Sequence, residues 1–310
     1  MTALEQYLGG LSDKRVGVIG AGVSNMPLIR MLRASGVRVT VHDKKEPTEL
    51  GDGYATLATL GVDFVLGEHY LDALDEDVIF RTPGVHPRFL EKAQAGGSEI
   101  TSEMELFFAV CPCPIIGITG SDGKTTTTTL AGEIFKKSGR KTYVVGNIGV
   151  AVISKAMEAD EDDWLVTETS SFQLETIKYF KPAVSAILNL TPDHLNRHHT
   201  MEAYGAAKAR IFENQDESGY CIVNYDDKLC CGLTKDCKAK VIPFSIREEL
   251  PLGAYLRADG MLVLRNEEGR EIGLCHRNEL KIIGDHNVQN ALAAAAISYF
   301  SGIEAETIHE

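Results

Sequence analysis

The stretch Thr119-Gly-Ser-Asp-Gly-Lys-Thr-Thr126 has the residue types that bind a chain of phosphate groups. An apolar run precedes it and a helical pattern follows, so we expect a glycine-rich turn between a buried strand and a helix. Backbone N–H groups in such a turn act with the helix dipole on an anion. Lys124 can reach the β and γ phosphates, and Thr125 can place its hydroxyl on Mg²⁺. The stretch predicts ATP binding by Gly120, Ser121, Asp122, Gly123, Lys124, Thr125 and Thr126.

The loop does not fit the general Walker A pattern. That pattern requires glycine where this chain has Ile118, and the extra glycine is Gly117. The alternative is a chance Gly-Lys-Thr in a surface turn. The strand before the loop and the helix after it are the context that phosphate binding needs, so the sequence favours a phosphate site.

A carboxylate follows the loop at the end of a second apolar strand, Trp164-Leu-Val-Thr-Glu168. An acid at the carboxyl end of a strand beside a phosphate loop is placed to bind Mg²⁺. Ser170 and Gln173 allow a different interpretation, because they have the spacing of a capping box for the next helix. Capping does not account for Glu168, so both interpretations can hold.

Three histidines, His194, His198 and His199, follow the apolar strand Val184–Leu190. Histidines grouped at a strand end can bind a metal, but a single histidine is more often structural. His194 is the best placed of the three, because it comes directly after the turn at Asp193.

Lys208 lies in a predicted helix, Met201–Asn214, among small residues. A lysine in a helix is most often a surface residue whose stem lies along apolar neighbours. Ala206, Ala207 and Ala209 leave room for close packing, so a buried lysine is also compatible with the sequence.

A second glycine turn, Gly20-Ala-Gly22-Val-Ser-Asn25, is similar to a dinucleotide-binding fingerprint. Asn25 replaces its third glycine, and Asp43 ends the second strand, where a ribose-binding acid would lie. The turn can be a tight connection without a ligand, an NAD site, or a site for UDP or a nucleotide sugar. The N–H groups of the turn can hold the diphosphate of NAD or of a uridine nucleotide equally well. This motif alone therefore leaves the three possibilities open.

Strand and helix patterns alternate along the chain, which predicts an α/β fold with parallel sheets. The first part has strands at Val16–Ile19, Val37–Val41, Val62–Leu66 and Val78–Phe80, with a helix at Met26–Ala34. A new unit begins near residue 102, with a helix at Glu103–Val110 and a strand at Ile115–Ile118. We predict a Rossmann-like domain over residues 1–102 and a P-loop ATPase-type domain over 103–300. Further strands are expected at Thr142–Val145, Gly219–Val223, Lys240–Phe244 and Met261–Leu264, and helices at Lys124–Lys137 and Asp285–Tyr299.

The composition sets limits on function. The 310 residues carry a net charge of −13 and are 44% hydrophobic, which suits two domains with their own cores. Nucleic acids and anionic membranes select basic surfaces, so neither is expected as a partner. We expect no signal peptide and no membrane span. The seven cysteines match no zinc pattern. We interpret them as reduced thiols, which are typical of cytoplasmic proteins.

Taken together, the motifs resemble the Mur ligases of bacterial cell-wall synthesis. They cover nearly the whole chain in the family's order: the phosphate loop, Gly146-Asn-Ile-Gly149, Glu168-Thr-Ser-Ser-Phe-Gln-Leu-Glu175, Asn189-Leu-Thr-Pro-Asp-His-Leu-Asn-Arg197, Tyr204-Gly-Ala-Ala-Lys-Ala-Arg-Ile-Phe-Glu-Asn214, Asn224-Tyr-Asp-Asp227 and His286-Asn-Val-Gln-Asn290. The Ser-Ser-Phe-Gln-Leu-Glu stretch selects the members that add D-glutamate. The resemblance implies an ATP-dependent amide ligase that joins D-glutamate to UDP-N-acetylmuramoyl-L-alanine through an acyl phosphate.

The resemblance also implies roles for single residues. Lys124, His194 and Lys208 would be catalytic, and Lys208 would be carbamylated, which turns a cation into an anionic metal ligand. Asn287 and Asn290 would lie near the adenine. One or two Mg²⁺ ions would be held by Thr125, Glu168, His194 and Lys208. The UDP substrate would bind Val23, Ser24, Asn25, Asp43, Lys44, Thr82, Pro83 and Gly84, with Asn147, Ser170, Gln173 and His194 at its muramoyl-alanine end.

The sequence departs from the family at its end. Family members have a third domain that binds the amino acid and closes over ATP, and residues 301–310 would be its start. We therefore expect a truncated, monomeric chain that binds the UDP substrate and ATP but ligates poorly. Asp122, where asparagine is also common, is expected to change nothing. Two other functions fit parts of the sequence: an NAD-dependent or nucleotide-sugar oxidoreductase, and a nucleotide-binding regulator without catalysis.

Overall fold

The chain folds as two compact units in a computed structural model that describes residues 1–22, 25–146, 152–156 and 158–310. The first unit contains residues 1–112, helix α8 (Val152–Ala156) and residues 176–179, and the rest forms the second unit. The sequence places the boundary near residue 102, whereas the first unit continues to Pro112. Helix α6 (Glu103–Val110) packs against α8 and α1 (Ala3–Gly9), which keeps it in the first unit.

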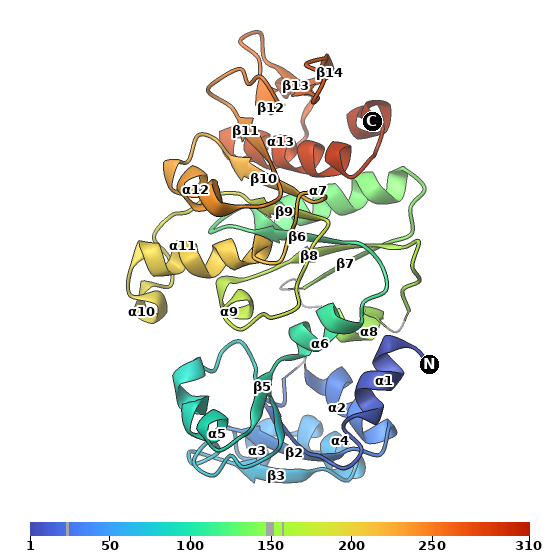
Figure 1. Ribbon diagram of the computed structural model, residues 1–310, viewed down its shortest axis with the longest axis vertical. Helices are drawn as coiled ribbons and strands as arrows, with labels where there is room; N and C mark the ends of the chain where they lie inside the picture. The colour runs from blue at the N-terminus through green and yellow to red at the C-terminus, as the bar shows by residue number, and fades with distance from the viewer. Residues whose placement is uncertain (23–24, 147–151, 157) are drawn as a thin grey trace. The chain divides into compact units, whose positions relative to one another are not determined.

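A five-stranded sheet in the order β3-β2-β1-β4-β5 forms the first unit, and all its neighbouring strands are parallel (Figure 1). Its strands are β1 (Arg15–Ile19), β2 (Arg38–Asp43), β3 (Asp63–Leu66), β4 (Val78–Phe80) and β5 (Glu99–Thr101). The chain runs from β1 outward to β3 and then returns to β4 on the other side of β1. The carboxyl ends of β1 and β4 therefore flank a switch point, the place where open α/β sheets bind ligands.

Short helices connect these strands. They are α2 (Asn25–Ala34), α3 (Pro47–Leu50), α4 (Asp52–Thr59), the 3-10 turn η1 (Pro87–Leu90) and α5 (Glu91–Ala95). α2 begins directly after the first glycine turn and buries Leu28, Ile29 and Leu32, which lie on one helical face. The helix predicted after this turn is thus confirmed.

Glu103, the first residue of α6, is a buried acid. One of its carboxylate oxygens accepts a hydrogen bond from the Ile153 N–H at 2.8 Å. Burial penalises the charged carboxylate and raises the pKa of Glu103 from its ordinary value of 4.5 to about 7, against the smaller opposing effect of the backbone hydrogen bonds. The folded protein therefore binds this proton more tightly than the unfolded chain does.

Replacing Glu103 by glutamine is expected to stabilise the protein at high pH. The contribution of Glu103 to stability is fully present below pH 4.5 and is lost as the pH rises to about 7. The unfolding free energy of Glu103→Gln should exceed that of the wild type by up to about 3 kcal/mol near pH 8 and match it near pH 4. Chemical denaturation at both pH values measures the difference, with the exposed Glu91→Gln as the control. An equal difference at both pH values would contradict the assignment.

A nine-stranded sheet in the order β14-β13-β12-β11-β10-β9-β6-β8-β7 forms the second unit. Neighbours are parallel from β7 to β12, and β12, β13 and β14 add an antiparallel edge. β6 lies between β8 and β9, so the carboxyl ends of these three strands meet at one edge of the sheet. The strands are β6 (Ile115–Thr119), β7 (Thr142–Gly146), β8 (Trp164–Glu168), β9 (Val184–Ile187), β10 (Tyr220–Asn224), β11 (Lys240–Ser245), β12 (Gly253–Leu256), β13 (Met261–Arg265) and β14 (Glu271–His276).

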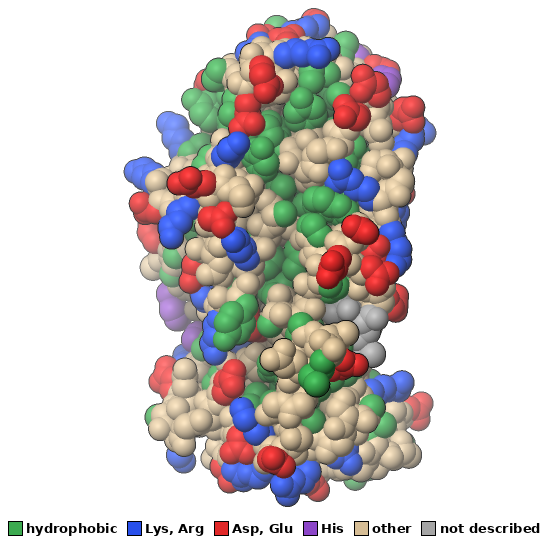
Figure 2. All heavy atoms as spheres, turned by 45° about the vertical axis from the view of Figure 1, so that its right-hand side comes forward, with side chains coloured by type: hydrophobic (Ala, Val, Ile, Leu, Met, Phe, Trp, Pro, Cys, Tyr) green, Lys and Arg blue, Asp and Glu red, His purple; other side chains and the backbone are tan. Residues whose placement is uncertain are grey.

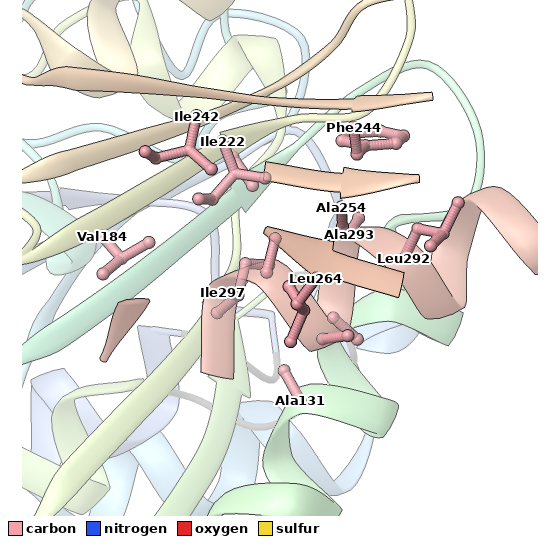
Figure 3. Packing of buried hydrophobic residues seen from close by; sticks show 14 of the residues in the cluster. Ala131, Val184, Ile222, Ile242, Phe244, Ala254, Leu264, Leu292, Ala293 and Ile297 are labelled. Atoms are coloured by element: carbon pink, nitrogen blue, oxygen red, sulfur yellow. The ribbon is translucent and has the colours of Figure 1, made fainter. Parts of the chain in front are cut away.

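Two long helices, α7 (Lys124–Lys137) and α13 (Asp285–Phe300), pack against each other and against this sheet. The alanines at 293–296 are buried, and their small side chains let α13 approach its neighbours closely. Figure 3 shows Ala293 and Ile297 of α13 within a cluster that includes Ala131 of α7 and Leu264 of the sheet. The shorter helices are α9 (Ser171–Leu174), α10 (Leu195–His198), α11 (Met201–Ala209), α12 (Lys228–Leu233) and α14 (Ala305–His309), with 3-10 turns η2 (Arg210–Phe212), η3 (Thr234–Asp236) and η4 (Arg277–Glu279).

The surface carries charges of both signs. On the face drawn in Figure 2, acidic and basic side chains of the described residues are intermixed. Within the described ranges, no helix is both long and apolar enough to cross a bilayer.

Candidate functional site

The predicted phosphate loop lies where β6 ends and α7 begins. β6 is buried over its whole length, and α7 starts at Lys124. Gly123, immediately before the helix, has a φ of +80°, a left-handed conformation that glycine adopts without strain. A side chain there would also overlap Asn290 of α13. The first-turn N–H groups of α7 lack partners within the helix, so with the dipole they form an anion-binding end.

Two lysine side chains converge on the carbonyl oxygen of Gly120. Lys124 Nζ donates to this oxygen at 3.0 Å and to the Ser121 carbonyl at 2.8 Å. Lys208 Nζ, from α11, donates to the Gly120 carbonyl at 2.7 Å. The two candidate catalytic lysines therefore meet at the loop, although they lie far apart in the sequence.

Lys208 is almost completely buried, with 1% of its surface exposed. The structure thus places it in the interior that its small neighbours permit. Burial, assisted by the positive charge of Lys124, lowers the pKa of Lys208 to about 7. Burial thus favours the uncharged form of this amine, and an uncharged amine is a nucleophile.

Tyr204 contacts Lys208 from one helical turn earlier and was not predicted as a site residue. The ammonium group lies 4.6 Å from the centre of the Tyr204 ring. The Tyr204 hydroxyl lies 3.2 Å from Ser121 Oγ, within hydrogen-bonding distance. Tyr204 therefore connects α11 to the phosphate loop, and its spacing four residues before Lys208 is the signal that was available.

Thr125 and Glu168, two of the predicted metal ligands, are in direct contact. The Thr125 hydroxyl donates to a Glu168 carboxylate oxygen at 2.8 Å. Register explains the meeting: Ile118 of β6 pairs with Glu168 of β8, so the carboxylate lies beside the start of α7. Carboxylate and hydroxyl oxygens are the ligands that Mg²⁺ prefers, so this pair suits that ion.

His194, another predicted metal ligand, contacts Phe172 and Asp193 in the structure. Its ring packs against Phe172 with 4.8 Å between ring centres, and its Nε2 lies 3.3 Å from an Asp193 carboxylate oxygen. His198 is buried, and its Nε2 is 3.0 Å from Ser171 Oγ. Burial lowers the pKa of His198, which favours its neutral form. Within the described part of the chain, no three His, Cys, Asp or Glu side chains gather as metal ligands would.

Asn287 and Asn290, the predicted adenine contacts, form a relay from α13 to α7. The Thr127 hydroxyl donates to Asn290 Oδ1 at 3.3 Å, and Asn290 Nδ2 donates to Asn287 Oδ1 at 3.1 Å. Asn287 Nδ2 donates in turn to the Ile283 carbonyl at 2.8 Å. The relay holds the start of α13 beside the phosphate loop, and a role in adenine binding stays a prediction.

The first glycine turn lies at the switch point of the first unit. Asn25 Nδ2 donates to the carbonyls of Ile19 and Gly20, both at 3.0 Å, so the asparagine that replaces the third glycine closes the turn. Asp43 accepts from the Ala21 N–H at 2.7 Å. Thr82 lies next to Gly20, which brings the predicted Thr82-Pro83-Gly84 turn to the same place. Lys44 is exposed beside Asp43, and the predicted contacts Val23 and Ser24 lie outside the described residues.

Ser170 and Gln173 form the expected capping box of α9. The Ser170 N–H donates to Gln173 Oε1 at 2.8 Å, and the Gln173 N–H donates to Ser170 Oγ at 3.3 Å. The capping interpretation is therefore confirmed, and substrate contact by these side chains stays a prediction. Asn147, predicted beside them, lies outside the described residues.

Residues 118–298 match the family model for the Mur ligase middle domain. The chain belongs to the Mur ligase family. It is 44% identical over 301 residues to a UDP-N-acetylmuramoylalanine–D-glutamate ligase of Caldanaerobacter subterraneus subsp. tengcongensis, covering 96% of this chain and 66% of the relative. A ligase of the same name from Clostridium kluyveri is 46% identical over 91% of this chain and 60% of its own length. This Mur ligase chain thus spans about two thirds of the length of these relatives.

Solved structures of Mur ligases share its fold. The UDP-N-acetylmuramate:L-alanyl-γ-D-glutamyl-meso-diaminopimelate ligase of Neisseria meningitides matches with a TM-score of 0.62 at 19% identity, covering 95% of this chain and 96% of that one. The UDP-N-acetylmuramate-alanine ligase of Thermotoga maritima matches with a TM-score of 0.53 at 21% identity, covering 95% and 67%. The predicted α/β fold, with a Rossmann-like part and a central ATPase-type part, is confirmed.

Proposed function

We propose that this Mur ligase chain takes part in the ATP-dependent addition of D-glutamate to UDP-N-acetylmuramoyl-L-alanine. The observation that carries the proposal is the group around Gly120, where Lys124 and Lys208 share one carbonyl next to the Thr125–Glu168 pair. The identity of 44% to a relative named for this reaction supports the same substrates. The oxidoreductase hypothesis does not account for the phosphate loop, and the relatives described above are all ligases.

The residues of the second unit suit phosphoryl transfer. A carboxylate is a poor electrophile, and transfer of the γ-phosphoryl group of ATP converts it to an acyl phosphate with a good leaving group. The amine of D-glutamate then displaces phosphate and forms the amide. Lys124 and the first-turn N–H groups of α7 would offset the charge repulsion between triphosphate and carboxylate. Mg²⁺, held by Thr125 and Glu168, would neutralise part of the phosphate charge.

Lys208 suits carbamylation in the proposed site. Its uncharged amine can attack CO₂, forming an N–C bond and releasing one proton, and the product carries a negative charge. Burial lowers the pKa of the Lys208 amine to about 7, which favours this reaction. The resulting carboxylate would face the loop near Thr125 and complete an oxygen-rich metal site, in which His194 is a further proposed ligand. A mass increase of one carboxyl group on the peptide that contains Lys208 would support the assignment.

The UDP end of the substrate is assigned to the first unit. Asn25, Asp43 and Thr82 lie around one turn at the switch point, and the backbone there can hold a diphosphate. The other proposed contacts are Val23, Ser24, Lys44, Pro83 and Gly84, with Asn147, Ser170 and Gln173 at the muramoyl-alanine end. ATP would be held by the loop residues 120–126 with Asn287 and Asn290.

Binding and turnover of separate ligands test the proposal. Calorimetry on the 310-residue chain should show binding of ATP with Mg²⁺ and, independently, of UDP-N-acetylmuramoyl-L-alanine, while NADH should not bind. Addition of all substrates is then followed by mass spectrometry for the D-glutamyl product. NADH binding without ATP binding would refute the ligase assignment. Partner-dependent nucleotide binding without formation of the D-glutamyl product would favour the regulator instead.

A further inference from the structure

The segment that follows β9 lies along the phosphate loop. The Leu188 N–H donates to the Thr119 carbonyl at 3.0 Å, and the Ser121 N–H donates to the Asn189 carbonyl at 3.0 Å. The loop therefore has a continuous backbone partner on the side of β9. β9 ends at Ile187, whereas the apolar pattern predicts a strand to Leu190.

The Asn189 side chain makes hydrogen bonds to both backbone polar groups of Asp122, its N–H and its carbonyl. Its Oδ1 accepts from the Asp122 N–H at 2.8 Å, and its Nδ2 donates to the Asp122 carbonyl at 3.0 Å. A side-chain amide has the same donor and acceptor as a peptide group, so asparagine here acts as an extra strand partner. Aspartate would lose the donor, and leucine would lose both groups.

Thr191, two residues after Asn189, also makes hydrogen bonds to the loop. Its N–H donates to Ser121 Oγ at 3.0 Å, and Ser121 Oγ donates to the Thr191 carbonyl at 3.1 Å. Its hydroxyl donates to an Asp122 carboxylate oxygen at 3.1 Å. Residues 189–191 thus hold both Ser121 and Asp122, in addition to the contacts that Tyr204 and Lys124 make with Ser121.

These bonds determine which N–H groups face a ligand. The N–H groups of Ser121 and Asp122 both donate to Asn189, so a phosphate would bind other N–H groups of the loop, among them those at the start of α7. Glycine at each end of this pair gives the loop wide backbone freedom, and ordering it costs free energy unless partners fix it. We propose that Asn189 is a positioning residue that fixes the phosphate loop in its nucleotide-binding conformation. The proposal rests on the ATP site proposed above.

Substitution of Asn189 tests the inference in two independent ways. Asn189→Leu should raise the Kd for ATP with Mg²⁺ about tenfold or more, while binding of UDP-N-acetylmuramoyl-L-alanine is unchanged. Amide hydrogen exchange of the peptide that covers residues 119–126 should accelerate about tenfold without any ligand. Asn189→Ala, which also removes both side-chain partners of the Asp122 backbone, should show the same changes and replaces the leucine variant if that does not fold.

Asn214→Leu is the matched control, because Asn214 Nδ2 also donates to a backbone carbonyl, that of Phe180, at 3.0 Å. It should leave ATP binding and loop exchange unchanged. Normal ATP affinity together with normal exchange in a folded Asn189→Leu protein would overturn the inference. Absence of ATP binding by the wild type would instead refute the proposed function, and the exchange measurement would still decide whether Asn189 fixes the loop.

Discussion

Lys208→Met is expected to reduce formation of the D-glutamyl product by about a thousandfold or more. Methionine fills a similar volume but cannot be carbamylated, so the proposed metal site loses an anionic ligand worth several kcal/mol of charge stabilisation. Replacing a buried, desolvated amine by an apolar side chain of similar volume is expected to be neutral or stabilising for the fold. The thermal unfolding midpoint should therefore stay the same or rise while activity is lost, a combination that general misfolding does not produce.

Product formation by mass spectrometry and thermal unfolding measure the two effects in the same preparation. Lys228→Met is the control, because Lys228 lies on α12 and is exposed. It should keep wild-type activity. Product formation by Lys208→Met within about tenfold of the wild type would remove Lys208 from the reacting groups.

Lys124→Ala is expected to raise the Kd for ATP about a hundredfold or more. The lysine ammonium would make charge-assisted hydrogen bonds to phosphate, and alanine makes none. The substitution also removes the positive charge that helps to lower the pKa of Lys208, so that pKa should rise, although burial still holds it below its ordinary value. Calorimetry measures the affinity for ATP and for UDP-N-acetylmuramoyl-L-alanine separately. Loss of ATP affinity alone indicates a defect at the loop, whereas loss of both affinities indicates misfolding.

Lys136→Ala is the matched control for this experiment. Lys136 lies in the last turn of the same helix, with its ammonium 2.8 Å from Glu133 at the surface. Its loss should leave both affinities unchanged, because an exposed pair of this kind contributes little. Equal ATP binding by Lys124→Ala and the wild type would show that the loop does not hold the triphosphate.

The sequence predicts the fold well where strands are buried on both faces. β4, β8 and α7 match their predicted bounds, because continuous apolar runs and glycine turns leave few alternatives. β5, β12 and β14 were not predicted. β5 and β14 are edge strands, which mix polar and apolar residues without a clear period, and β12 is a strand of only four residues. The helix expected over Met201–Asn214 ends at Ala209 and continues as the 3-10 turn η2.

The sequence predicted which residue types belong to the candidate site, but not which of their side chains are in contact. Thr125 and Glu168 follow neighbouring strands, and strand neighbours decide that they touch. Lys208 could be read as a surface residue until the position of α11 was known. Asn189 stands in a recognisable motif, but its role depends on β9 lying beside β6, which no local pattern reveals.

Helix α13 contacts both the hydrophobic core of the second unit and the phosphate loop of the proposed ATP site. One face of this helix is the alanine run of the core, and its first turns carry Asn290 against Gly123. A bulkier residue at the buried position of Ala293 would displace α13 from its neighbours and change the position of Asn290 relative to the loop. With the proposed ATP site, interior positions of α13 would be constrained by nucleotide affinity as well as by stability, so fewer changes would be acceptable there during evolution than packing alone would allow.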